Sequence, residues 1–140
     1  MSILLNEDIE TIFLNTKKIV KSLRGKTILI TGGNGFLGKY FLELFKKYNK
    51  YFNKKIKILV YDNNLKKNFN DPINNIKYIK HDVSNKIITR SKVDIIIHAA
   101  GIASPYYYRK KPIETLDVAI NGTRNCLEIA KKNNSKFIFF

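Results

Sequence analysis

The segment Thr31-Gly32-Gly33-Asn34-Gly35-Phe36-Leu37-Gly38 is the most informative part of the sequence, because it has glycines in the spacing G-x-x-G-x-x-G between two patterned segments. Residues 26–31, which precede it, form a short β-branched run that predicts a buried strand. Residues 36–48, which follow it, predict a helix. A glycine-rich turn that leaves a strand and opens a helix is the context in which such a turn binds a phosphate group.

Each of the three spaced glycines has a separate physical reason. We expect Gly32 to allow the tight turn, Gly35 to remove a Cβ that would block a pyrophosphate, and Gly38 to let the helix pack close to the strand. Phe36 and Leu37 lie at the helix start, where free backbone amides and the helix dipole favour an anion. The spacing differs from the more familiar G-x-G-x-x-G, but the same physics applies.

The rest of the chain alternates strand and helix patterns. Further strands are predicted at residues 56–61, 76–80, 93–98 and 137–140, and further helices at residues 5–23 and 112–132. This alternation predicts an α/β fold, a Rossmann-type doubly wound parallel sheet with strand order 3-2-1-4-5. Residues 1–25 are then a helical N-terminal extension, and residues 26–140 a dinucleotide-binding domain cut off in its fifth strand.

Composition excludes several classes of protein. The chain has 140 residues, 44% of them hydrophobic, which fits one globular domain and excludes a disordered chain. No apolar run is long enough to span a membrane, and the N-terminal residues do not form a signal peptide. The chain has one cysteine, so no internal disulfide is expected. We therefore expect the protein to be in the cytoplasm. The net charge of +15 is open to two interpretations: a nucleic-acid partner, or the lysine-rich composition of an AT-rich genome, which we favour.

An acidic residue ends the second predicted strand. Asp62, followed by Asn63, stands where a carboxylate accepts hydrogen bonds from the adenosine ribose hydroxyls and repels a 2′-phosphate. This pattern favours NAD over NADP. Lys66 and Lys67 keep NADP as the less favoured cofactor, and a simple turn at Asp62 is the structural alternative.

Taken together, these motifs resemble the N-terminal part of the extended short-chain dehydrogenase/reductases, in the NAD-dependent epimerase/dehydratase family that acts on nucleotide sugars. The resemblance is carried by TGGNGFLG at 31–38, YDN at 61–63, HDV at 81–83, HAAGIASP at 98–105 and NGTRNCLEIA at 121–130. Within the family, the sequence ASP with Tyr108 and Pro112 most resembles the UDP-glucuronate decarboxylases, followed by the nucleotide-sugar 4,6-dehydratases.

The resemblance implies roles for individual positions. Asp82 would bind the adenine amino group, and Val83 would pack beside the ring. The small residues Ala99, Ala100 and Gly101 would line the cofactor. Three residues would lie near the nicotinamide and sugar: Ser104, Pro105 and Tyr108. The structural alternatives are a loop cap at Asp82, tight packing at residues 99–101 and an aromatic cover of the sheet end at residues 106–108.

The resemblance places the catalytic machinery of the family, a Ser/Thr and a Tyr-x-x-x-Lys pair, after the fifth strand. We therefore expect no catalytic residue within this chain. Three Tyr-x-x-x-Lys matches, at 51–55, 106–110 and 107–111, are interpreted as chance in a chain rich in both residues. Ala119 also stands where many relatives have an Asn, and no His or Cys spacing suggests a metal site.

The implied function is the NAD-binding part of a nucleotide-sugar decarboxylase, 4,6-dehydratase or epimerase, homodimeric when complete. A non-catalytic module that senses NAD(H) or binds an acidic partner is the alternative.

Overall fold

A computed structural model describes residues 6–140 and shows a six-stranded sheet between helices. The strands follow the order β3 (Phe69–Asp71), β4 (Ile76–Lys80), β2 (Lys57–Asp62), β1 (Thr27–Thr31), β5 (Ile95–His98) and β6 (Lys136–Phe139). All neighbouring pairs are parallel except β3 with β4. The Rossmann-type α/β class is confirmed, and the predicted order recurs with one added strand.

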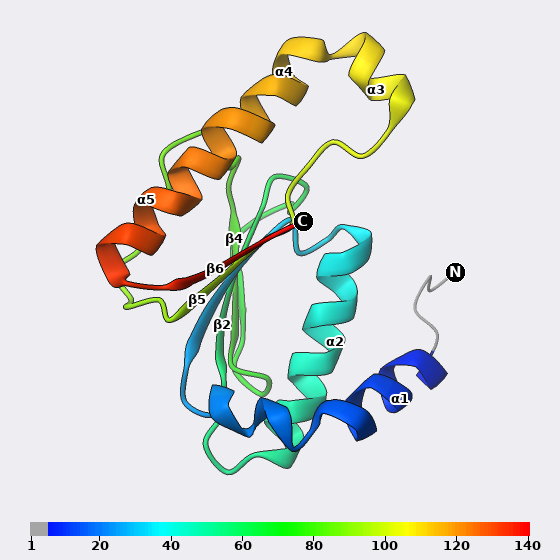
Figure 1. Cartoon of the computed structure of the whole chain (residues 1–140), viewed down its shortest axis with the longest axis vertical. Helices are drawn as coiled ribbons and strands as arrows, with labels where there is room; N and C mark the ends of the chain where they lie inside the picture. Colours follow the sequence, from blue (N-terminus) through cyan, green and yellow to red (C-terminus); the bar gives the residue numbers. More distant parts are fainter. Residues whose placement is uncertain (1–5) are drawn as a thin grey trace.

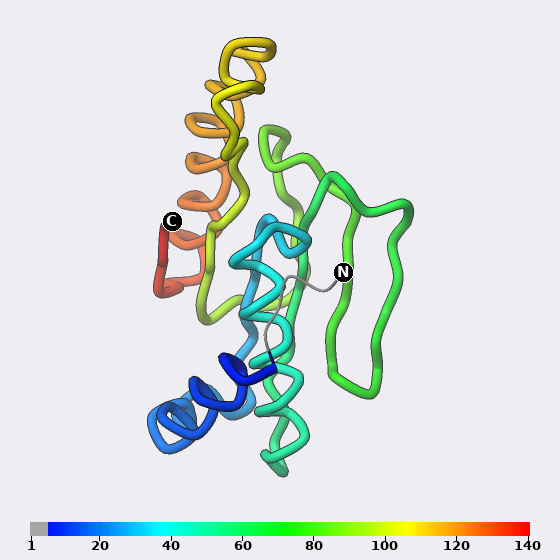
Figure 2. Tube along the Cα trace, turned by 90° about the vertical axis from the view of Figure 1, so that its right-hand side faces the viewer, coloured from blue at the N-terminus to red at the C-terminus, as the bar shows by residue number. Residues whose placement is uncertain are grey.

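The added strand is β3, which forms an antiparallel hairpin with β4 at one edge of the sheet, opposite β6 at the other edge (Figure 2). It has three residues and lies in an Asn- and Lys-rich segment, so its sequence is more typical of a turn than of a strand. Stacking of Phe69 on Tyr78, with ring centroids 4.2 Å apart, holds it in place. A cross-strand aromatic pair therefore overrides the poor local propensity.

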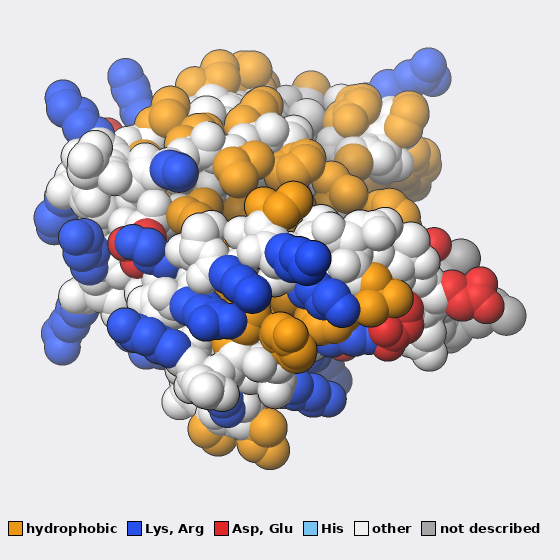
Figure 3. Space-filling model, turned by 60° about the horizontal axis from the view of Figure 1, so that its bottom comes forward, with side chains coloured by type: hydrophobic (Ala, Val, Ile, Leu, Met, Phe, Trp, Pro, Cys, Tyr) orange, Lys and Arg blue, Asp and Glu red, His pale blue; other side chains and the backbone are white. Residues whose placement is uncertain are grey.

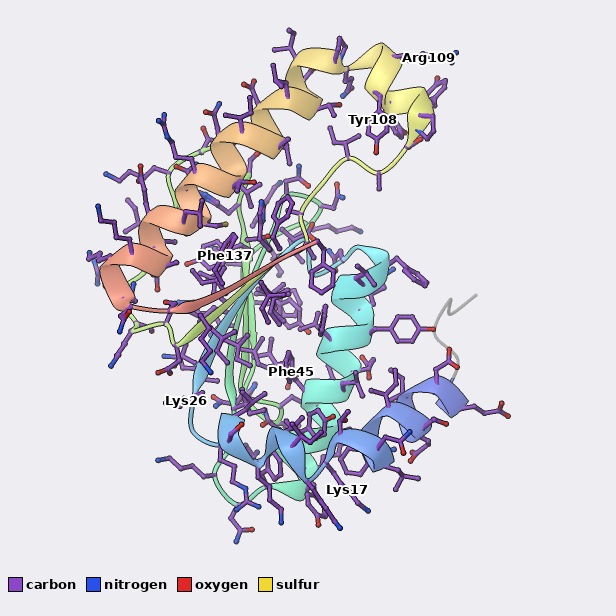
Figure 4. The ribbon with its side chains drawn as sticks, in the orientation of Figure 1. Lys17, Lys26, Phe45, Tyr108, Arg109 and Phe137 are labelled. Carbon is purple, nitrogen blue, oxygen red and sulfur yellow. The ribbon has the colours of Figure 1, made fainter. Side chains whose placement is uncertain are left out.

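Helices cover both faces of the sheet (Figure 1). On one face lies α2 (Phe36–Tyr51); on the other lies a long helix formed by α4 (Pro112–Asp117), η2 (Val118–Gly122) and α5 (Thr123–Asn133). Phe45 lies between α2 and the sheet, and Phe137 lies on the side that faces α5 (Figure 4). Continuous apolar strands such as β5 suit a sheet that is covered twice.

The helix predicted at residues 112–132 is not uniform, because η2 is a turn of π-helix. Gly122 at its end is buried, and a Cβ there would lie 2.9 Å from Cγ2 of Val83. A π turn adds a residue to the helix and is a common adjustment where a helix meets a functional region. The short helix α3 (Pro105–Lys110) stands beyond its N-terminal end.

The helix predicted at residues 5–23 is broken into α1 (Asn6–Thr16) and a 3-10 helix, η1 (Ile19–Leu23). Residue 5 lies outside the described residues. Phe13 packs on Tyr48 of α2, with ring centroids 5.3 Å apart, and the Thr16 hydroxyl shares a hydrogen bond with the Tyr48 hydroxyl. This contact fixes the direction of α1 across α2, so the chain must turn before it enters β1 through Gly25, whose φ is +69°.

Lysine and arginine side chains are spread over the face that contains the N-terminal helices (Figure 3). Within residues 6–140, ion pairs join Lys26 to Asp94, Lys46 to Glu43 and Lys47 to Glu10. None of the helices formed by those residues has the length and apolarity that a bilayer crossing requires.

Candidate functional site

The glycine turn has the shape that its sequence predicts. Gly32 has a φ of +72°, and a Cβ there would lie 2.6 Å from the carbonyl oxygen of Ala99. Gly38 faces the turn itself, since its Cβ would lie 2.6 Å from Cα of Gly33. The helix therefore packs on the backbone of the turn, and only glycine permits either approach.

The start of α2 is open to an anion. Gly35 is the N-cap residue and gives no side-chain cap, so the first amides of this 16-residue helix are not satisfied by a capping side chain. A Cβ at Gly35 would meet only the carbonyl oxygen of Gly32, at 3.1 Å. A concave backbone surface with free amides and a positive dipole end is suited to a phosphate group.

Asp62 lies at the end of β2 and is 5% exposed. Its Oδ2 accepts a hydrogen bond from the backbone N–H of Asn34 at 2.7 Å, and its Oδ1 accepts one from the N–H of Asn64 at 2.8 Å. The carboxylate therefore fixes the glycine turn as well as its own turn. A carboxylate has about four lone-pair sites, so both oxygens retain acceptor capacity for a ligand.

Asp82 and Val83 follow β4 and lie beside Asp62 in the same cavity. Partial burial would raise the pKa of Asp82, but hydrogen bonds from the Ser84 side chain and backbone and from Asn63 together lower it below its ordinary value of 3.8. Asp82 is therefore an ionised acceptor. It also caps its own turn, because its Oδ1 accepts the N–H of Ser84 at 2.9 Å, so the predicted loop cap is present.

The loop that contains these residues is held from α5. The side-chain amide of Asn125 donates to the carbonyl oxygens of Val83 and Asn85, at 2.8 and 2.9 Å. Gly122 packs against the side chain of Val83. Asn125 and Gly122 belong to the segment 121–130 that carried the resemblance, and the structure gives both a supporting role behind the cavity wall.

The small residues after β5 lie directly under the glycine turn. The N–H of Ala99 donates to the carbonyl oxygen of Thr31 at 3.2 Å, and the N–H of Ala100 donates to its hydroxyl at 3.3 Å. A Cβ added to Gly101 would have no heavy atom of residues 6–140 within 4 Å, so this residue is open to the cavity. Tight packing, the structural alternative, therefore accounts in part for the small side chains at Ala99 and Ala100, but it does not account for the glycine at position 101.

These segments enclose a cavity of about 500 Å³ at the carboxyl ends of the parallel strands. It is lined by Gly32, Gly35, residues 61–64, 81–83 and 99–104, Tyr107, Lys111 and Val118. The structure thus brings together nine of the sequence-predicted residues: Gly32, Gly35, Asp62, Asn63, Asp82, Val83, Ala99, Ala100 and Gly101, with Ser104 at one end.

The other predicted residues lie outside this lining. Phe36, Leu37 and Gly38 form the first turn of α2, Pro105 begins α3, and Tyr108 lies on α3 with its side chain 45% exposed (Figure 4). The neighbour of Tyr108, Tyr107, lines the cavity instead. A helix turn was not predicted at residues 105–110, and its phase decides which of three successive tyrosines faces inward.

The lining residues that were not predicted as site residues are Tyr61, Asn64, His81, Ile102, Ala103, Tyr107, Lys111 and Val118. Four of them, Tyr61, His81, Ile102 and Ala103, lie within the motifs that carried the resemblance. Tyr107 and Lys111 are also one of the rejected Tyr-x-x-x-Lys matches. Both line the cavity, but no hydrogen bond joins their side chains in the described part of the chain, and Tyr107 is 48% exposed. The two side chains therefore share only the cavity, and the two residues are joined through the backbone, where the N–H of Lys111 donates to the carbonyl oxygen of Tyr107 at 2.8 Å. No group of three His, Cys, Asp or Glu residues suited to a metal ion occurs within residues 6–140.

A glycine turn at a helix start, an acid on the next strand and a cavity at the strand ends define a Rossmann-type dinucleotide-binding domain. The profile of the NAD dependent epimerase/dehydratase family matches residues 28–140. The chain belongs to this family, and the resemblance inferred from its motifs is confirmed.

The chain is also similar to a decarboxylase and to two epimerases. UDP-glucuronic acid decarboxylase 6 of Arabidopsis thaliana is 32% identical over 131 residues, which cover 89% of this chain and 35% of that protein. Epimerase Mth375 of Methanothermobacter thermautotrophicus shares the fold, with a TM-score of 0.70, 22% identity and coverage of 91% and 38%. UDP-glucose 4-epimerase of Bifidobacterium longum, in complex with NAD+ and UDP, has a TM-score of 0.56, 26% identity and coverage of 81% and 36%. The chain therefore spans about a third of the length of each of these proteins.

Proposed function

We propose that this chain is the NAD-binding part of a nucleotide-sugar-modifying enzyme, a decarboxylase, 4,6-dehydratase or epimerase. The single observation that carries the proposal is the cavity that is lined both by Gly35, the N-cap residue of α2, and by the acids Asp62 and Asp82. In this assignment, the amides at the start of α2 hold the pyrophosphate, Asp62 holds the adenosine ribose, and Asp82 holds the adenine amino group. The similarity to UDP-glucuronic acid decarboxylases supports the nucleotide-sugar class.

The charge of the lining supports NAD rather than NADP. Asp62 and Asp82 are both acidic, and Lys66 and Lys67 are not among the residues that line the cavity. A 2′-phosphate beside two carboxylates would be repelled, and no cation of the lining lies next to Asp62 in sequence to compensate.

NAD, when bound, supplies a hydride acceptor that converts a sugar hydroxyl to a ketone. The described residues bind and orient: backbone amides hold phosphate, small residues 99–101 allow close approach, and Lys111 adds a positive charge to the lining. The nucleotide sugar is the proposed substrate, a homodimer is the proposed assembly, and a cytoplasmic setting is the proposed location. The family's proton-transfer residues are proposed to lie outside residues 1–140.

Calorimetric titration of the chain with NAD and with NADP tests the assignment. We expect NAD to bind and NADP to bind at least about 10-fold more weakly, a difference of about 1.4 kcal/mol. Gly35→Val, which fills the concave surface, should abolish binding, and Asn53→Val, at an exposed position that does not line the cavity, serves as the control. Equal affinities for the two cofactors would reject the ribose assignment, and no binding of either would reject the proposed function.

A further inference from the structure

His98 ends β5 and lies beneath the cavity rather than in its wall. Its side chain is 1% exposed and is surrounded by Phe137, Phe139 and Gly122. Burial lowers the pKa of His98 below its ordinary value of 6.5, so the ring is neutral at neutral pH. A buried imidazole in apolar surroundings costs free energy unless its nitrogens are paired, so packing alone does not explain the residue.

One ring nitrogen is paired, and the other is not. Nδ1 of His98 lies 2.6 Å from the hydroxyl oxygen of Thr31, which is itself fully buried. Nε2 has no hydrogen-bond partner among residues 6–140. The hydroxyl of Thr31 also accepts the backbone N–H of Ala100 at 3.3 Å. Three groups therefore form a chain: the Ala100 amide, the Thr31 hydroxyl and the His98 ring.

The position of the ring proton determines which group donates in each of these hydrogen bonds. If Nδ1 carried the ring proton, it and the Ala100 amide would both donate to Thr31, and the hydroxyl proton would have no acceptor. Two buried groups, the hydroxyl proton and the Nε2 lone pair, would then be unsatisfied. If Nε2 carries the proton, the hydroxyl donates to Nδ1 and only Nε2–H is unsatisfied, which is the less costly arrangement.

This series of hydrogen bonds ends at Ala100, a residue that lines the cavity. Ala100 lies against Gly32, since a Cβ on Gly32 would meet both Cα and the amide nitrogen of Ala100 at 2.7 Å. Thr31 binds Ala99 through its carbonyl oxygen and Ala100 through its hydroxyl, and it precedes Gly32 directly. The Thr31 hydroxyl therefore adds one hydrogen bond between the start of the glycine turn and the loop after β5, beside the backbone bond from Ala99.

We propose that His98 is a positioning residue: as the neutral Nε2–H tautomer, it orients the Thr31 hydroxyl, which holds the Ala100 amide and so fixes the two sides of the cavity relative to each other. The consequence for affinity rests on the proposed binding of NAD. The hydrogen bonds that join His98, Thr31 and Ala100 do not depend on NAD, because they are present in the structure itself.

The tautomer is tested on the unmodified chain. Long-range 1H–15N spectra of the 15N-labelled protein without ligand distinguish protonated from unprotonated ring nitrogens. We expect Nε2 of His98 to be protonated and Nδ1 to be unprotonated. The opposite assignment overturns the proposal, and this measurement requires no variant to fold.

Matched variants test the positioning role. His98→Asn places its terminal atoms as far from Cβ as Nδ1 is, whereas His98→Gln reaches the position of Nε2. Thr31→Ser keeps the hydroxyl, and Thr31→Val removes it with little change in shape. We expect His98→Gln and Thr31→Val to speed hydrogen exchange of the Ala100 amide and to weaken NADH binding about 10-fold, as for the loss of one hydrogen bond. His98→Asn and Thr31→Ser should stay within about 3-fold.

The outcomes separate the two proposals. If the wild-type chain does not bind NADH, the proposed function fails, and the tautomer and the Ala100 exchange rates still judge the role of His98. If the wild type binds NADH and all four variants match it in both affinity and Ala100 exchange, the positioning role is overturned.

Discussion

The carboxylate of Asp62 accepts the backbone N–H of Asn34 at 2.7 Å, which joins the end of β2 to the middle of the glycine turn. The second oxygen of the same carboxylate accepts the N–H of Asn64. One nearly buried side chain thus supports the phosphate-binding turn while it forms part of the proposed ribose site. The two roles have different experimental signatures.

Replacing Asp62 should affect both roles. Asp62→Asn keeps one acceptor oxygen but turns an NH₂ donor toward a backbone N–H donor, so we expect a loss of about 1–3 kcal/mol in the free energy of unfolding. Asp62→Ala should weaken both cofactors through the turn and NAD by the larger factor through the ribose. Calorimetric titrations with NAD and NADP give the ratio, and equal losses would limit Asp62 to its role in the turn.

Gly32→Ala should destabilise the protein. The alanine would have to adopt a φ of +72°, and its Cβ would lie 2.6 Å from the carbonyl oxygen of Ala99. We therefore expect the free energy of unfolding, measured by urea denaturation, to fall by at least about 1 kcal/mol. Gly101→Ala is the control, because no described heavy atom lies within 4 Å of its Cβ position. Its unfolding free energy should change by no more than about 0.5 kcal/mol. Similar losses in the two variants would contradict the geometry of the turn.

These glycines also show what a sequence can reveal. Gly32, Gly35 and Gly38 were identifiable because a positive φ at Gly32 and the close approach of backbone atoms at Gly35 and Gly38 restrict the residue type. The hydrogen bond from the N–H of Asn34 to Asp62 was not identifiable, because it joins residues 28 positions apart whose approach depends on the completed sheet. The parallel strands were predictable from apolar runs, whereas β3 has no such run.

The phase of short helices was the other limit. The sequence pointed to Tyr108, but α3 turns Tyr107 toward the cavity. Likewise, the break between α1 and η1 follows from the contact of Thr16 with Tyr48, which no local pattern encodes. Residues that line the cavity from irregular segments, such as His81 and Lys111, are placed by tertiary packing alone.

Asn49 should be a determinant of stability far from the cavity. Its side chain is 2% exposed; its amide donates to the carbonyl oxygens of Ile56 and Asn74, and its oxygen accepts the N–H of Ile56. Asn49→Ala removes these partners from the Ile56 N–H and the Asn74 carbonyl, while Asn75 Nδ2 still donates to the Ile56 carbonyl, so we expect a loss of about 1–3 kcal/mol in urea denaturation. Asn53→Ala, at an exposed position in the adjoining loop, should change little. A neutral Asn49→Ala would show that water replaces the amide without cost.

His98 should make stability depend on pH in a defined window. Burial lowers the pKa of its ring below 6.5, so in mildly acid solution the unfolded chain binds a proton that the folded chain does not. The free energy of unfolding should therefore fall as the pH decreases below about 6.5 and stop falling once the native ring is protonated. The lowered pKa values of Asp82 and Asp94, ordinarily 3.8, act only in more acid solution.

Urea midpoints measured between about pH 7.5 and pH 5 check this dependence. The slope should shrink in His98→Asn and remain in His81→Asn, which keeps the buried ring. A slope that is unchanged in His98→Asn would assign the dependence to another group.

The π turn at Val118–Gly122 makes the number of residues in this helix a structural constraint. It accommodates one residue more than an α-helix would, so that Lys111 and Val118 reach the cavity while Cys126 is fully buried in the core. Regular α-helical geometry over the same residues would rotate the two halves of the helix by nearly one residue step, about 100°, relative to each other. Deleting one residue inside Val118–Gly122 would convert the π turn to α-helix and keep the two halves in phase, whereas a deletion elsewhere in the helix would rotate the cavity-lining half away from the half that is buried in the core.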